Sequence, residues 1–111
     1  MKFVSILALA LFTLNSHSAE QCASWGCVST IEELYTNAVG NIYVSTPLDE
    51  TGANCTVYPG NYFILPPDQQ NTDKVYSQIL AAYISQSKIQ LRITEGDGYC
   101  KIKYVRQSAV F

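Results

Sequence analysis

The chain has 111 residues, of which 48% are hydrophobic and 14% charged, and its formal net charge is −2. No cluster of lysines and arginines stands out, which argues against nucleic acid as a partner. A domain of this size buries only about 60–65% of the surface of its unfolded chain, so we expect it to need covalent stabilisation.

Residues 1–19 have the features of a secretory signal peptide. Lys2 supplies a positive start, an apolar stretch follows, and small and polar residues lead to a cleavage point after Ser18 or Ala19. The apolar stretch is too short to cross a bilayer as a helix. We therefore expect a secreted or periplasmic protein without a membrane span, in which residues 20–111 form a single domain.

Residues 29–39 fit both a helix and a strand. Thr30 and Glu33 match a helix capping box, and the apolar residues of this stretch recur at helical spacing. The alternative is a strand over 27–36 that turns at 37–41 into the next strand. We choose the strand because it completes a β-β-β-α-β-β order, which forms a small closed barrel.

The middle of the chain predicts two more strands and one helix. Residues 40–46 and 55–65 are rich in β-branched and aromatic residues and are bounded by turn residues, which favours strands. After a proline-containing loop, residues 71–87 predict a helix, with Asn71 or Thr72 as its cap. Its apolar positions recur at helical spacing: Val75, Ile79, Ala82 and Tyr83.

Residues 88–106 predict a β-hairpin with its turn at 95–98, where the sequence EGDG tolerates positive φ angles. The first strand, 88–93, alternates three apolar residues with polar ones: Ile89, Leu91 and Ile93. The second strand, 100–106, predicts one face with Cys100, Ile102 and Tyr104 and the opposite face with Lys101, Lys103 and Val105. Each strand therefore has one face suited to a core.

Together these elements predict a mainly β fold with one helix, a small OB-like barrel stapled by disulfides. An even number of cysteines in a small secreted domain indicates two disulfides, and four cysteines allow three pairings. Our hypothesis is a Cys55–Cys100 bond, which ties the sheet to the terminal hairpin. The second bond, Cys22–Cys27, would then close a small ring near the N-terminus.

Reactive side chains are scarce in this sequence. The one histidine, His17, falls in the predicted signal peptide, and oxidised cysteines supply neither a nucleophile nor a zinc ligand. The neighbouring acids Glu32–Glu33 and Asp49–Glu50 read as solvated surface charge. We therefore expect no enzymatic activity and assign no catalytic residue, cofactor or metal.

Aromatic residues are abundant instead, with eight tyrosines and one tryptophan. A tyrosine side chain combines a flat apolar face with a polar tip, which suits the recognition of sugars and proteins. We select Trp25, inside the predicted cysteine ring, and Tyr58 and Tyr62, around a Pro-Gly turn, as binding residues. Tyr83 and Tyr104 are expected to belong to the core.

Two segments, VYSQILAAYISQSKIQLRI and GYCKIKYVR, carry a resemblance to known proteins. The chain resembles small exported bacterial proteins of unknown function, with a GxIYV strand, a central cysteine, a YSxxLAAY helix and a terminal CxIxYVR strand. It is also similar to the binding subunits of subtilase cytotoxin and typhoid toxin, which have an OB barrel. This similarity also favours the strand over 27–36, and it implies a ring of five copies that recognises cell-surface glycans.

Two main functional hypotheses follow. The first is a secreted, non-enzymatic binding module, a glycan-binding protein like a toxin B subunit, with a homo-pentamer as its assembly. The second is a periplasmic accessory or inhibitor protein that acts through a protein–protein interface. A hydrolase that uses only carboxylates and tyrosines is a third and weaker interpretation.

Overall fold

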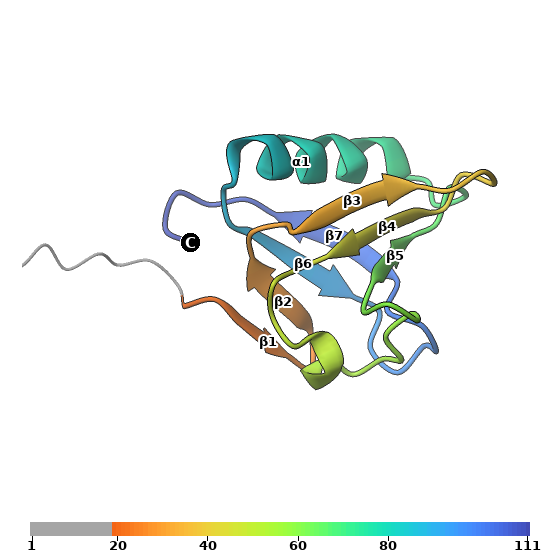
Figure 1. Cartoon of the computed structure of the whole chain (residues 1–111), viewed down its shortest axis with the longest axis horizontal. Helices are drawn as coiled ribbons and strands as arrows, with labels where there is room; N and C mark the ends of the chain where they lie inside the picture. Colours follow the sequence, from red (N-terminus) through yellow and green to blue (C-terminus); the bar gives the residue numbers. More distant parts are fainter. Residues whose placement is uncertain (1–18) are drawn as a thin grey trace, which may run out of the picture.

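The computed structural model describes residues 19–111 (Figure 1), so the predicted signal peptide, with His17, lies outside the described residues except for Ala19. The predicted mainly β fold with one helix is confirmed. The elements in chain order are β1 (Gln21–Ala23), β2 (Gly26–Ser29), β3 (Glu33–Thr36), β4 (Ile42–Ser45), the 3-10 helix η1 (Glu50–Gly52), β5 (Phe63–Leu65), α1 (Thr72–Ser85), β6 (Ile89–Ile93) and β7 (Ile102–Arg106).

The strands form two antiparallel sheets, one in the order β1-β2-β6-β7 and the other in the order β3-β4-β5. On one side, β2 runs into β3 through three residues. On the other side, Ile64 of β5 forms a parallel bridge with Lys101, and its N–H donates to the carbonyl of Cys100 at 2.9 Å. The β2–β3 connection and the bridge at Ile64 therefore link the two sheets on opposite sides, and a closed barrel is not formed by the strands assigned within residues 19–111.

Two of the predicted strands are shorter than expected. The strand over 27–36 is divided into β2 and β3, because the chain bends between the two sheets and buries Ile31 at the bend. Of the strand predicted over 55–65, only β5 is formed. The turn at Pro59 interrupts the predicted strand, and Cys55 lies before this turn, outside β5. The short strand β1 was not predicted.

The alternation predicted for the last hairpin is confirmed in β6 and wrong in β7. Arg92 pairs with Tyr104, whereas the next residue of β6 pairs with Ile102, so Lys103 is an unpaired extra residue. This β-bulge reverses the alternation beyond it. Val105 is consequently buried and Tyr104 is 39% exposed, so the prediction that Tyr104 belongs to the core is wrong.

Helix α1 lies across one end of the two sheets, next to β3 and β7 (Figure 1). Val75, Ile79 and Ala82 are buried as predicted, but Tyr83 is 37% exposed, so its assignment to the core is wrong. At 3.6 residues per turn, Tyr83 lies about 80° around the helix from Val75, which places it at the edge of the buried face.

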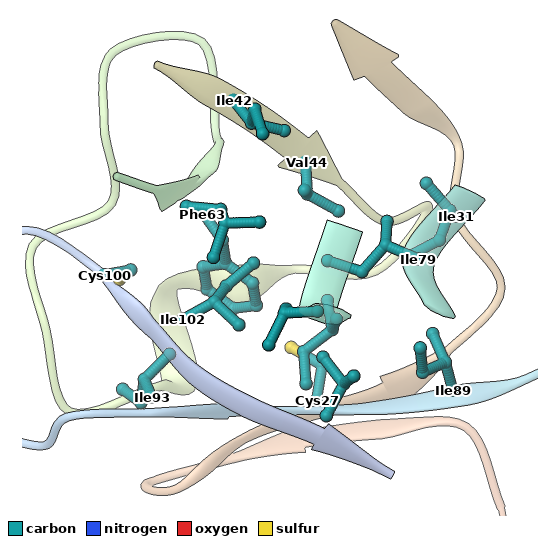
Figure 2. Packing of buried hydrophobic residues seen from close by; sticks show 14 of the residues in the cluster. Cys27, Ile31, Ile42, Val44, Phe63, Ile79, Ile89, Ile93, Cys100 and Ile102 are labelled. Carbon is teal, nitrogen blue, oxygen red and sulfur yellow. The ribbon is translucent and has the colours of Figure 1, made fainter. Parts of the chain in front are cut away.

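One hydrophobic core fills the space between the sheets and the helix. Figure 2 shows Val44 from β4, Ile102 from β7 and Ile79 from α1 meeting in it. Both predicted disulfides, Cys22–Cys27 and Cys55–Cys100, are present. Because Cys27 and Cys100 are completely buried, each disulfide attaches a peripheral segment directly to this core.

Candidate functional site

Five of the eight tyrosines lie against one another, and we call this group the tyrosine surface. Tyr35 and Tyr99 are exposed, Tyr58 and Tyr62 are half-buried, and Tyr43 is 5% exposed beneath the other rings. Four of its ring pairs have centroids 4.8 to 5.3 Å apart, and a fifth pair lies at 5.9 Å. These separations are in the range at which aromatic pairs attract each other. Its members are Tyr35, Tyr43, Tyr58, Tyr62 and Tyr99.

The β3–β4 hairpin places the first two members of the tyrosine surface. Tyr35 and Tyr43 are directly opposite each other, so their side chains share a face of the sheet. Their rings stack at 4.8 Å with an interplanar angle of 19°. The neighbouring pair, Leu34 and Val44, points to the other face and packs in the core. Alternation along the two strands therefore directs both tyrosines away from the core, where Tyr35 is exposed and Tyr43 is covered by the neighbouring rings.

A tight turn adds the next two members. Tyr58 and Tyr62 bridge each other across it, and both Gly60 (φ 97°) and Asn61 (φ 65°) adopt positive φ angles. A Cβ atom at position 60 would lie 2.5 Å from the Tyr62 ring. The observed position of the Tyr62 ring therefore requires glycine at position 60. Tyr62 meets Tyr35 edge-on at 5.3 Å.

The fifth member comes from the last hairpin and depends on a disulfide. Tyr99 forms a parallel bridge with Thr56, and each of these residues is adjacent in sequence to one cysteine of the Cys55–Cys100 bond. The ring of Tyr99 lies 5.2 Å from that of Tyr58. The disulfide therefore holds together two segments, far apart in the sequence, that each contribute a tyrosine.

Hydrogen bonds fix several hydroxyls of the tyrosine surface. Tyr62 donates to a carboxylate oxygen of Glu33 at 2.9 Å, and this bond raises the pKa of Tyr62 above its ordinary value. A hydrogen bond with Tyr43 raises the pKa of Tyr58, and desolvation raises that of Tyr35. The upward direction of all three pKa shifts favours the neutral phenols, whose hydroxyls can each donate one hydrogen bond.

Of the three predicted binding residues, the structure brings together Tyr58 and Tyr62. Trp25 lies in the turn between β1 and β2 of the other sheet, where its ring centre is 5.1 Å from the guanidinium of Arg92. The prediction missed the remaining members of the tyrosine surface: Tyr35, Tyr43 and Tyr99. A signal for two of them was present, because a hairpin that turns at 37–41 already pairs Tyr35 with Tyr43.

Other features of residues 19–111 lie outside the tyrosine surface. One cavity of about 500 Å³ is lined by polar residues and lysines next to the start of α1: Gln69, Gln70, Asn71, Lys74 and Lys103. Within this part of the chain, no group of three or more His, Cys, Asp or Glu side chains could hold a metal ion. No helix among these residues is long and apolar enough to cross a membrane.

The tyrosine surface can bind a ligand by stacking and by hydrogen bonding. Its exposed rings offer apolar planes, and Tyr99 and Tyr35 are 46% and 38% exposed. Its hydroxyls and the carboxylate of Glu33 offer donors and acceptors in fixed positions. No family model, curated protein or solved structure matches this chain.

Proposed function

We propose that this protein is a secreted, non-enzymatic binding protein that recognises a carbohydrate through the tyrosine surface. The observation that carries the proposal is the continuous contact among five tyrosine rings from three separate parts of the chain. A single exposed tyrosine is ordinary, but a contiguous aromatic patch marks an interaction site, and here four at least partly exposed rings pack over the buried ring of Tyr43. Secretion is supported by the two disulfides, which are typical of oxidising compartments.

The chemistry of the tyrosine surface favours a sugar among the ligands that OB-like barrels take. Barrels of this kind bind oligonucleotides and oligosaccharides. An oligonucleotide would meet the negative charge of Glu33 in a chain of net charge −2. A neutral sugar instead places its C–H groups on the tyrosine rings and its hydroxyls against the phenols and the carboxylate.

The assembly we propose for this function is the five-membered ring that the toxin similarity implies. A ring would present several tyrosine surfaces to one glycan-bearing cell surface, and the avidity of the assembly would then exceed the affinity of one site. Light scattering on the purified protein measures the mass of the assembly. A monomeric mass would contradict the five-membered assembly. Carbohydrate binding by a single tyrosine surface would then be tested separately.

A glycan array tests the proposal, with Tyr35→Ala as the variant and Tyr83→Ala as its matched control. The two side chains are almost equally exposed, but Tyr83 lies on α1 outside the tyrosine surface. We expect Tyr35→Ala to weaken the binding of the best glycan about tenfold or more, because it removes one ring and exposes its neighbours. Equal weakening by both variants, or no glycan bound by the unaltered protein, would contradict the proposal.

A further inference from the structure

A second group of aromatic and charged side chains lies on the outer face of the four-stranded sheet, away from the tyrosine surface. The guanidinium of Arg92 lies 5.1 Å from the ring centre of Trp25 and 5.8 Å from that of Tyr104. Both distances are within the range of cation–π attraction. We call these three residues the arginine patch.

Three separate features of the fold hold the arginine patch in place. The Cys22–Cys27 disulfide closes the turn that carries Trp25, and the carbonyl of Trp25 accepts the N–H of Ile93 at 3.0 Å. The β-bulge in β7 turns Tyr104 to the outer face, directly opposite Arg92. On the neighbouring strand β2, the residue paired with Arg92 is Gly26, which has no side chain to cover this face. The guanidinium is therefore oriented before any ligand arrives.

Charge on this sheet is one-sided. The strands β1, β2, β6 and β7 contain no Asp or Glu, but they carry Arg92, Lys103 and Arg106. Within residues 19–111, the guanidinium of Arg92 makes no hydrogen bond or ion pair, and its contacts are the two rings. A guanidinium has five N–H donors in a planar fork that fits a carboxylate. The arginine patch therefore offers an oriented, unneutralised cation in a chain whose net charge is negative.

We propose that the arginine patch docks an acidic segment of a partner polypeptide, with a carboxylate of the partner on Arg92. Charge complementarity requires an acidic partner. Trp, Tyr and Arg are the residue types that dominate binding energy in protein–protein interfaces, and here all three are in contact. Arg106 provides a second guanidinium on β7, and it lies over the ring of Phe111 and donates from Nη1 to Oε1 of Gln90 at 3.3 Å. Its remaining N–H groups can donate to a further carboxylate. This proposal does not depend on carbohydrate binding by the tyrosine surface.

Peptides of defined charge test the proposal on the full exported protein. The probe is a short dye-labelled peptide of alternating glutamate and threonine, and its counterpart carries glutamine in place of glutamate. Trp25 is the only tryptophan of the chain, so its fluorescence reports binding at the arginine patch directly. Fluorescence anisotropy of the labelled peptide then compares the protein variants.

The variants separate the planar fork of Arg92 from its charge. We expect Arg92→Gln to weaken glutamate-peptide binding about tenfold or more and Arg92→Lys to weaken it less, because lysine keeps the charge without the fork. Lys74→Gln removes a charge from α1 and should leave binding within about twofold. Arg92→Lys also keeps the test valid if Arg92→Gln fails to fold. We further expect the affinity of the unaltered protein to fall as salt is added.

Several outcomes would overturn the proposal. One is equal binding of the glutamate and glutamine peptides, and another is unchanged binding by both Arg92 variants. A dissociation constant above about 1 mM for the glutamate peptide would mean that the arginine patch supplies too little free energy for docking. Tighter binding of an oligoglucuronate than of the peptide would assign the arginine patch to an acidic sugar instead.

Discussion

Removal of the Cys55–Cys100 disulfide should destabilise the protein more than removal of the Cys22–Cys27 disulfide. The bond joins residues 45 positions apart, and the loop-entropy relation then gives about 4 kcal/mol of stabilisation at room temperature. Domains of this size unfold at a cost of roughly 5–15 kcal/mol in total, so the loss is a large share. With a shift of about 4–8 °C per kcal/mol, the double variant Cys55→Ala/Cys100→Ala should melt roughly 15–30 °C lower.

The other disulfide supplies the matched control. Cys22 and Cys27 are only five positions apart, and the same relation gives about 2 kcal/mol for replacing both by alanine. Urea unfolding followed by circular dichroism measures both losses. The near-ultraviolet signal of the tyrosines should fall more in the Cys55/Cys100 variant, because this bond holds Tyr99 against Tyr58 in the tyrosine surface. Equal losses in the two variants, or a larger loss for the short ring, would refute this reasoning.

Three further changes test particular parts of the structure. Gly26→Ala should cost more than about 3 kcal/mol in urea unfolding, because the new Cβ would lie 1.9 Å from the carbonyl oxygen of Leu91. Glu50 is 1% exposed, so its interpretation as solvated surface charge is wrong, and burial raises its pKa. The free energy of unfolding should therefore fall as pH rises through that raised pKa. Glu50→Gln should remove this fall in urea midpoints measured from about pH 4 to 7. Glu33→Gln should lower the pKa of Tyr62 in an ultraviolet titration, because the hydroxyl would lose its carboxylate acceptor.

Each of these changes has a contrary result that is easy to recognise. Normal folding of Gly26→Ala would show that β2 and β6 do not approach as closely as described. A Glu50→Gln variant with the pH dependence of the unaltered protein would place the titrating group elsewhere. An unchanged titration of Tyr62 in Glu33→Gln would mean that their hydrogen bond is absent in solution.

The parts of the fold that follow from local patterns were predictable. The alternation of Ile89, Leu91 and Ile93 and the helix before them are confirmed, since both depend on which side chains face the core. The pairing of Cys55 with Cys100 followed from the element order, which brings the third strand next to the terminal hairpin.

The features that depend on single backbone irregularities were not predictable. Nothing in the sequence KIKYV marks Lys103 as an extra residue, and the bulge there moves Tyr104 out of the core and beside Arg92. The strand predicted over 27–36 is likewise divided into β2 and β3, because the chain bends where Ile31 packs into the core. The two sites therefore differ in how far the sequence predicts them. The pairing of Tyr35 with Tyr43 follows from the register of the hairpin, whereas the arginine patch depends on the bulge in β7.

Carbohydrate recognition by the tyrosine surface is the central claim, and fluorine NMR of protein labelled with fluorotyrosine tests it most directly. Of the eight tyrosines, five belong to the tyrosine surface, and two lie on α1 outside both proposed sites and serve as internal controls: Tyr76 and Tyr83. Titration with the glycan that binds best on the array should shift resonances of the five and leave the two controls unchanged. Shifts confined to tyrosines outside the tyrosine surface, or no shift at a saturating glycan concentration, would contradict the claim.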